Sequence, residues 1–511
     1  MLPRFRSCVW LVGAALLALQ LVFLTGPGIE EDEALFVLPF TRGNPSLYEW
    51  HAGRFHIPVM SMDYLGGLKS WLYWPVFRLW EPNVWSMRLP ACFLSVVTVL
   101  LFAHLARRAG GSRVALAAEL FLATDAMFVL INVFDMTVTL LLLATVLFLC
   151  LLRRFAASGH QPSLGAAFLV AGLALWYKAI FIFPLAGMLV AFLIAYPRAV
   201  WRSFTLRNIV VAAVCMLIGA APLIVFNWER RGATVHASGE LPSAPAIEKL
   251  VMLQHTLDGR AFEHYMFRSS LSEKVALDGA PADLVLRWYR ESHFGPGSAL
   301  LPALLLSLLA LPFLRSSHLF PPLLFSWIAM TTAYGAMFVF RDAGAGPHHT
   351  VLLDPAPHFI VAATAAALSE RWLGRRNAAL VAFCAVVAAS NIWLLGRYAH
   401  AAHANGFSVY WTDGVKNLAQ VIGAQNLPVA VLDWGIHNGL EIESRDTVTF
   451  VADPAPRENV LYVTHCEGYV ILPAAQFPKL LAASGLHKTA ARVVADKKGH
   501  LVFCLFQLAK D

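Results

Sequence analysis

The feature that most constrains this chain is a series of long apolar runs. A helix that crosses the hydrocarbon core of a bilayer needs about 20 apolar residues. Of the 511 residues, 58% are apolar and 14% are charged, against roughly half and a quarter in a soluble domain. We therefore predict a mainly α, polytopic membrane protein with about eleven transmembrane helices. The runs lie at about 8–24, 89–106, 114–131, 136–152, 164–177, 180–196, 209–227, 298–314, 319–340, 357–370 and 377–395.

Two apolar stretches allow more than one interpretation. We expect the first to be retained, because residues 26–33 offer no small-x-small cleavage site after the apolar core. The stretch 165–196 is too long for one span and carries Lys178 near its middle. Arginines flank it on both sides, and both groups lie in the cytoplasm only if the stretch crosses twice. We predict two short helices that turn near Lys178.

The distribution of arginines predicts the orientation. With these spans, arginines gather on one side of the membrane with few acids, as cytoplasmic loops do. The N-terminus is then cytoplasmic, and two loops, at about 25–88 and 228–297, lie outside together with a tail from 397. The net charge of +7 follows from this asymmetry, so we predict membrane lipids and no nucleic acid as partners. The arginines are Arg4, Arg6, Arg107, Arg108, Arg113, Arg153, Arg154, Arg198, Arg202, Arg207, Arg315, Arg371, Arg375 and Arg376.

The tail differs from the rest of the chain in composition. Short β-like runs and two helical candidates alternate there, which predicts a small α/β domain at 397–511 after a membrane domain at 1–396. Cys466 and Cys504 either pair in an oxidising compartment or stay buried as free thiols. The β-like runs are 429–433, 447–451, 459–464 and 500–507, and the helical candidates are 413–424 and 475–484.

Carboxylates beside apolar helices are functional candidates, because charge is costly there. Four acids, Glu30–Glu33, follow the first helix and repel one another, which raises the pKa of at least one and suits it to accept a proton. The alternative is a solvated outer loop. Asp135 stands between two apolar runs and serves as a helix cap, as a catalytic acid, or as both.

Cations on the outer side are candidates for binding a phosphate. Arg54, Lys69 and Arg88 lie among five aromatic residues of the first loop, where a plain interfacial helix is the alternative. Lys178 follows Trp176 and Tyr177, and a lysine that snorkels to the interface is the alternative there.

A histidine pair is a further candidate. His348 and His349 are adjacent in an outer loop and suit a phosphate or a metal ion, although we predict no defined metal site.

Several of these motifs occur together in one known family. The chain resembles the GT-C glycosyltransferases over about residues 8–395, with the closest similarity to the branch of the protein O-mannosyltransferases and the lipid A aminoarabinose transferases. The resemblance implies transfer of a sugar from a polyprenyl phosphate to a protein, lipid or glycan outside the cytoplasm, here across a bacterial inner membrane with a periplasmic tail. The motifs are Asp32-Glu33-Ala34, Tyr64 to Tyr73, Met87-Arg88-Leu89-Pro90, Asp135, Trp176-Tyr177-Lys178 and His348 to His358.

The same resemblance implies roles for the residues. By this resemblance Asp32 is either the base that accepts the proton of the acceptor or the carboxylate that orients the acceptor, with Glu33 beside it and Asp135 as the second acid. We expect an inverting single displacement. We assign no required cofactor, and the need for a divalent metal stays open. One departure concerns the first loop, where Asp63 to Lys69 replaces the Glu-Lys-Pro-Pro-like stretch of the aminoarabinose branch. The implied substrate-binding residues are Arg54, Lys69, Arg88, Lys178, His348 and His349.

Two other functions fit a polytopic chain. A lipid or solute transporter or flippase has many helices and a few buried charges, but it usually shows paired repeats and broken helices at the midplane. A membrane-anchored scaffold would leave Asp135 and Lys178 without a role.

Overall fold

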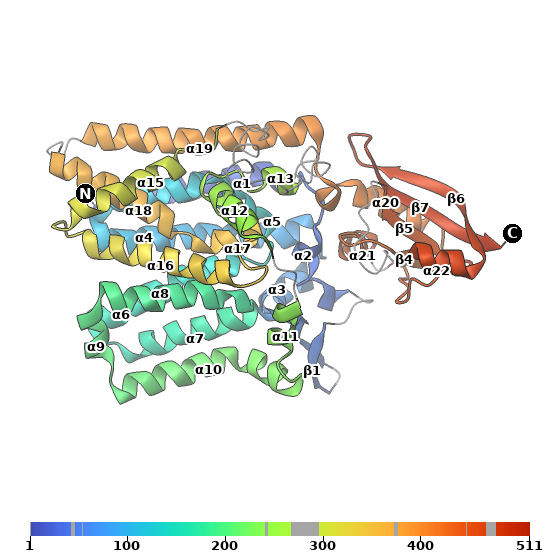
Figure 1. The fold of residues 1–511 in the computed structure, drawn as a ribbon, viewed down its shortest axis with the longest axis horizontal. Helices are drawn as coiled ribbons and strands as arrows, with labels where there is room; N and C mark the ends of the chain where they lie inside the picture. Colours follow the sequence, from blue (N-terminus) through green and yellow to red (C-terminus); the bar gives the residue numbers. More distant parts are fainter. Residues whose placement is uncertain are drawn as a thin grey trace.

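The computed structural model describes residues 2–41, 46–53, 55–240, 244–266, 296–372, 377–445, 447–466 and 477–510. Long helices form a bundle, and a small sheet with short helices stands beyond one end of it (Figure 1). The N-terminus lies at the opposite end of the bundle from this tail (Figure 1). The predicted architecture of a helical membrane region and an α/β tail is therefore present.

Each predicted apolar run falls on helix. Within the described residues, seven helices are long and apolar enough to span a membrane, or eight if one bent pair counts as a span, so the chain is an integral membrane protein. The number eleven stays a prediction. The bundle helices are α1 (Leu2–Phe23), α4 (Val84–Thr124), α5 (Ala126–Phe134), α6 (Thr139–Ser158), α7 (Gln161–Tyr177), α8 (Ile182–Ala195), α10 (Leu206–Glu229), α15 (Leu300–Ala310), α16 (Phe320–Val339), α18 (Ala356–Trp372) and α19 (Asn377–Asn405).

Breaks between these helices occur where the sequence disfavours continuous helix. Gly111 has φ of +83° inside α4, and this divides the element into the two predicted runs. α7 ends at Tyr177, and Lys178 is extended before a 3-10 turn and α8. The predicted turn at Lys178 is confirmed. A short helix, α9 (Pro197–Ser203), then joins α8 to α10.

The first outer loop forms a small antiparallel sheet and an interfacial helix. Strands β1 (Tyr48–Ala52), β2 (Phe55–Met62) and β3 (Leu65–Gly66) pair in the order β1-β2-β3. α3 (Leu68–Leu79) follows; it buries Lys69 and Tyr73 but exposes Trp74 and Leu79. An exposed apolar face on such a helix fits the edge of a bilayer.

Shorter elements cover the end of the bundle that faces the tail (Figure 1). α2 (Glu31–Ala34) and the 3-10 helix η1 (Leu38–Phe40) follow α1. The second loop contributes α11 (Ala233–Glu240), α12 (Ala246–Leu257) and α13 (Glu263–Met266). α17 (Pro347–Thr350) carries the histidine pair.

The tail contains a four-stranded sheet of order β4-β5-β7-β6, in which only β4 and β5 are parallel. Three predicted strands and both predicted helices are present. The run 447–451 makes an isolated bridge to Val429 and no strand, while β6 and α21 were not predicted. α19 continues past residue 396, so the predicted boundary falls inside a helix. The elements are α20 (Gly414–Gly423), β4 (Val429–Val431), α21 (His437–Ser444), β5 (Leu461–His465), α22 (Phe477–Ser484), β6 (Leu486–Ala495) and β7 (Leu501–Lys510).

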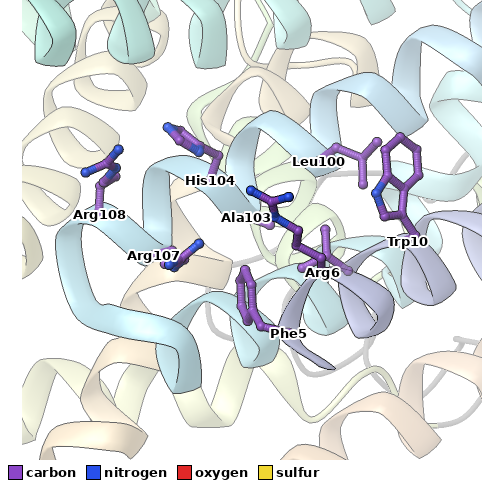
Figure 2. A pocket seen from close by; sticks show the side chains of 9 residues that line it. Phe5, Arg6, Trp10, Leu100, Ala103, His104, Arg107 and Arg108 are labelled. Carbon is purple, nitrogen blue, oxygen red and sulfur yellow. The ribbon is translucent and has the colours of Figure 1, made fainter. Parts of the chain in front are cut away.

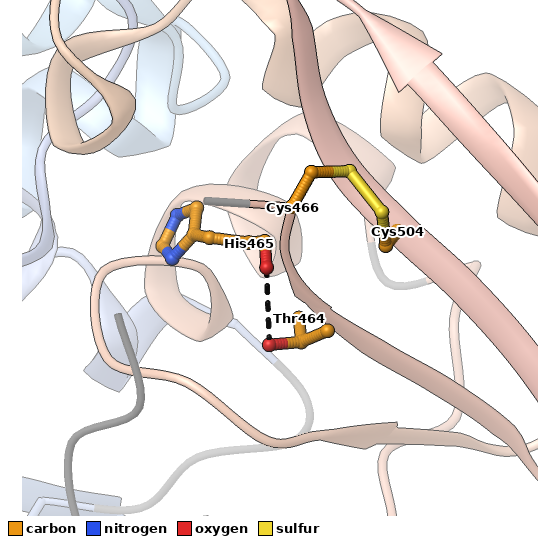
Figure 3. Close-up of a disulfide and its surroundings, with 4 residues drawn as sticks. All are labelled: Thr464, His465, Cys466 and Cys504. Carbon is orange, nitrogen blue, oxygen red and sulfur yellow. Dashed lines mark hydrogen bonds between the residues drawn. A yellow bond between two sulfur atoms is a disulfide. The ribbon is translucent and has the colours of Figure 1, made fainter. Parts of the chain in front are cut away.

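A disulfide joins two neighbouring strands of the tail. Cys466, which directly follows β5, bonds to Cys504 of β7 (Figure 3). Antiparallel pairing of β5 with β7 sets Thr464 opposite Cys504 and brings the two sulfurs together. Of the two states that the sequence allowed, the structure has the paired one.

Candidate active site

The four acids after α1 have different surroundings. Glu30 is buried and caps α2, where its Oε2 accepts hydrogen bonds from the backbone N–H groups of Asp32 at 2.8 Å and Glu33 at 3.1 Å. Such a cap satisfies amides that the first turn of a helix leaves unpaired. Glu30 therefore fixes the conformation of the motif.

Glu33 is paired with Arg88 inside the protein. The guanidinium donates from Nε and Nη2 to the two carboxylate oxygens, both at 2.6 Å, and both side chains are buried. The remaining donors of Arg88 bond to the carbonyls of Leu24, Pro27 and Gly28. Because all five N–H donors of Arg88 have protein acceptors, this arrangement leaves none for a lipid phosphate. The geometry thus differs from the roles expected for both residues.

Asp32 is the acid of the motif that keeps a free carboxylate. Within the described part of the chain, its side chain accepts no hydrogen bond and forms no ion pair, and it is partly exposed. Burial raises the pKa of Asp32, and the nearby charge of Lys178 opposes that rise. A carboxylate of this kind can accept a proton from a bound molecule.

Glu31 faces the tail. Its Oε2 accepts a hydrogen bond from the backbone N–H of Asn438 at 3.3 Å, and the Asn438 side chain donates to the backbone carbonyl of Glu31. Asn438 belongs to α21, which packs on α2. Burial raises the pKa of Glu31 to about 7. The tail therefore directly contacts the acidic motif.

Lys178 is held beside Asp32 by the loop that follows Asp135. Its Nζ donates to Thr137 Oγ1 at 2.6 Å and to the carbonyl of Met136 at 3.2 Å. The side chain is buried, so the alternative of a snorkelling lysine is wrong. In the part of the chain that the structure describes, these two bonds leave the third ammonium N–H of Lys178 for a ligand.

Asp135 stabilises that loop. Its Oδ1 accepts hydrogen bonds from the backbone of Val138 and Thr139 at the start of α6, both at 3.0 Å, and its Oδ2 pairs with Lys69 Nζ at 2.7 Å. Burial alone would raise the pKa of Asp135, but the ammonium and the two amides hold it below its usual value. Asp135 thus bonds to the first amides of α6, but the helix begins at Thr139 and not at Met136, as the predicted cap required. Lys69 is also buried, with Nζ 3.3 Å from the centre of the Phe36 ring.

The histidine pair lies near Lys178. His348 and His349 lie within electrostatic reach of Lys178, and their rings contact each other edge to face at 4.1 Å between centres. Arg54 falls outside the described residues. The site therefore brings together Asp32, Lys178 and the histidine pair, with the Glu33–Arg88 and Asp135–Lys69 pairs behind them.

Comparison with known proteins identifies the fold of the chain. A family profile described as dolichyl-phosphate-mannose-protein mannosyltransferase matches residues 68–226. The apo structure of ArnT from Cupriavidus metallidurans aligns over 97% of this chain and 97% of that chain, with 14% identity and a TM-score of 0.61. The chain has the GT-C glycosyltransferase fold. This confirms the resemblance that the sequence motifs indicated.

Further GT-C structures align over most of the chain. ArnT from Cupriavidus metallidurans bound to undecaprenyl phosphate is 16% identical, covers 97% of both chains and has a TM-score of 0.53. The Archaeoglobus fulgidus oligosaccharyltransferase in complex with Zn and sulfate is 12% identical over 96% of this chain and 72% of that chain, with a TM-score of 0.51. No curated protein matches the chain by sequence.

A hollow in the bundle lies away from these acids. It measures about 440 Å³ between α1 and α4 and presents several cations, as Figure 2 shows. The cations come from the arginine-rich ends of the helices, which the predicted orientation assigns to the cytoplasm. The hollow is therefore separate from the candidate active site. Its lining residues are Phe5, Arg6, Val9, Trp10, Leu100, Ala103, His104, Arg107 and Arg108.

Sequence reasoning missed Thr137 and gave Tyr64, which begins one of the motifs, no role of its own. Thr137 holds Lys178, but a lone threonine in an apolar segment gives no signal. Tyr64 lies within reach of the Asp32 charge, and burial raises the pKa of its hydroxyl to about 12. Tyr64 is also the backbone partner of Ala179, so the sheet of the first loop directly positions the turn at Lys178.

Proposed function

We propose that this chain is a glycosyltransferase that transfers a hexosyl or pentosyl group from a polyprenyl-phosphate donor to a protein, lipid or glycan acceptor on the extracytoplasmic face. The observation that carries the proposal is the free, partly exposed carboxylate of Asp32 beside the buried ammonium of Lys178. A base next to a cation is what displacement of a phosphate by a hydroxyl requires.

The reaction proceeds as a single displacement with inversion. An acceptor hydroxyl loses its proton to Asp32 while its oxygen bonds to the anomeric carbon of the sugar. The bond between that carbon and the phosphate oxygen breaks, and the electron pair leaves with the polyprenyl phosphate. Lys178 stabilises the negative charge that develops on the leaving phosphate, through the N–H donor that the protein leaves free.

The other predicted residues act through these two. Glu33 and Arg88 fix the α2 motif to the start of α4 and so position Asp32. Asp135 and Lys69 hold the loop whose Thr137 binds Lys178. We assign them as positioning residues in place of the direct roles expected from the sequence.

The donor side of the site is proposed from charge and from comparison. His348 and His349 lie close to Lys178 and are suited to bind the sugar or phosphate of the donor. The ArnT structure that contains undecaprenyl phosphate and the family described by dolichyl phosphate mannose both point to a lipid phosphate donor. An inner-membrane location with a periplasmic tail belongs to the same proposal.

The proposal is tested by sugar transfer with purified protein. Radiolabelled sugars on polyprenyl phosphate are incubated with envelope extracts and with wild type, Asp32→Asn or Glu458→Gln. Glu458→Gln is the matched control, because Glu458 is an exposed acid of the tail. We expect transfer by wild type and by the control, and a loss of about 10²- to 10⁴-fold in Asp32→Asn.

Two outcomes would contradict the proposal. Full transfer by folded Asp32→Asn would remove Asp32 as the base. Absence of transfer from every donor, together with substrate flux in liposomes that contain folded wild-type protein, would favour the transporter.

A further inference from the structure

The outer hairpin carries a group of metal-ligand side chains on one face. Glu49 and His51 stand two residues apart on β1, so their side chains project to the same side of the strand. The β1–β2 register sets His56 directly opposite His51. Residues on this face are exposed or half-buried, whereas Trp50, on the other face, packs against a buried cluster under the hairpin.

The donor atoms of these three side chains converge. One ligand atom from each of Glu49, His51 and His56 lies within 4.8 Å of the others. His56 Nδ1 is 3.1 Å from Glu49 Oε2, and the two imidazole rings meet edge to face at 4.7 Å between centres. The backbone N–H of Ser46 donates to Glu49 Oε1 at 3.3 Å, which restricts the carboxylate. The strands thus bring the three ligands together without a change of fold.

We propose that Glu49, His51 and His56 form a binding site for a divalent transition metal ion, with Zn²⁺ as the preferred ion. Two imidazoles and one carboxylate make up a donor set used for zinc, with a fourth position left to water. Mg²⁺ and Ca²⁺ prefer sites made of oxygen ligands, so this donor set disfavours them. The proposal does not depend on the glycosyltransferase activity.

The position of the site indicates its role. β2 leads to β3, and Leu65 of β3 forms a backbone bridge to Lys178. A metal ion that ties β1 to β2 therefore stiffens the sheet that supports the turn at Lys178. We infer a structural role for the metal ion, which would join β1 to β2. Its three ligands are distinct from Asp32, Asp135 and the histidine pair.

The test measures metal binding directly. Full-length protein without a polyhistidine tag is freed of metal with a chelator and titrated with Zn²⁺ by calorimetry, and Co²⁺ absorption reports the ligand geometry. The variants are Glu49→Gln, His51→Asn and His56→Asn. His236→Asn is the matched control, because it removes an exposed histidine of the second outer loop.

We expect wild type and the control to bind Zn²⁺ at this site, and each ligand variant to bind it about 10- to 100-fold more weakly. Zn²⁺ should also slow hydrogen exchange of the β1 and β2 amides in wild type but not in His51→Asn. Equal Zn²⁺ binding by wild type and by all three ligand variants would overturn the proposal. Mg²⁺ binding as tight as Zn²⁺ binding would also overturn it.

Discussion

Four neighbouring acids with nearly the same chemistry differ here in their contacts. The capping contacts of Glu30 and the ion pair of Glu33 are internal, while Glu31 contacts the tail. Asp32 has neither kind of contact among the described residues. A buried carboxylate needs hydrogen bonds or an opposite charge, so partner geometry selects which acid stays free to react.

The raised pKa of Asp32 predicts how activity depends on pH. A base must be deprotonated, and burial moves the pKa of Asp32 above the usual value for an aspartate. We expect the transfer rate to rise with pH as Asp32 loses its proton, and to level off above its pKa. The measurement is kcat/KM against pH for wild type and Asp32→Glu. An acid limb that has the same midpoint in both proteins would assign the limb to another group.

If Arg88 has a structural role in its pair with Glu33, its substitution should lower stability; if it binds the donor, its substitution should weaken donor binding. Arg88→Met leaves a buried carboxylate without its cation, so we expect a loss of about 3 to 5 kcal/mol in unfolding free energy. Glu33→Gln combined with Arg88→Met should recover part of this loss. Thermal unfolding in detergent measures both. Unchanged stability of Arg88→Met together with lost binding of polyprenyl phosphate would instead make Arg88 a donor ligand.

At the scale of elements, short contacts between distant segments build the site. The sheet of the first loop supports the turn between α7 and α8, since Leu65 bridges Lys178. Gly66 permits this approach, because a Cβ there would lie 2.2 Å from the carbonyl oxygen of Trp176. The α2–α21 contact similarly joins the acidic motif to the tail.

The α2–α21 contact predicts a stability that depends on pH. The pKa of Glu31 is about 7 in the folded protein, above its ordinary value of 4.5. Between these two values the folded state binds more protons than the unfolded state, so stability falls as pH rises from about 4.5 to about 7.

Glu31→Gln should remove this dependence, because the amide is neutral and still accepts the hydrogen bond of Asn438. At pH 8 we expect Glu31→Gln to have a higher apparent Tm than wild type, because wild type loses at most about 3 kcal/mol of unfolding free energy when Glu31 ionises. Near pH 4.5 the two proteins should have the same apparent Tm. Thermal scans of solubilised protein across this pH range measure the effect. Parallel Tm curves for the two proteins would show that Glu31 does not cause it.

At the scale of the whole molecule, the arginine-rich ends of the helices and the disulfide-bonded tail lie at opposite ends of the bundle. Arginine-rich loops stay in the cytoplasm, and disulfides persist in oxidising compartments. Both arguments favour a tail outside the cytoplasm.

This orientation is testable with fusions and peptide mapping. Alkaline phosphatase fused after Asp511 should be active in a bacterial host, whereas a fusion after Arg108 should be inactive. Non-reducing mass mapping of the first protein should find one peptide pair that joins Cys466 and Cys504. An inactive C-terminal fusion with reduced Cys466 and Cys504 would reverse the orientation.

The sequence by itself determined the features that depend on local pattern. The apolar runs predicted where helices form, and the charges at their ends gave the candidate residues Asp32, Asp135 and Lys178. It did not predict the strand β6, and it placed the end of α19 too early, because local pattern marks the ends of elements only weakly.

Only the tertiary structure decided the partner of each charged side chain. Glu33 and Arg88 are 55 residues apart, and Glu31 and Asn438 are 407 apart, yet both pairs are in contact. Hydropathy is a sum over neighbouring residues, so it can be read along the chain. A hydrogen bond depends on placement within about 3 Å, which is set by the packing of all the helices together. For this reason the candidate residues could be predicted from the sequence, but only the fold shows that Asp32 is free within the described part of the chain while the other carboxylates of the motif have partners.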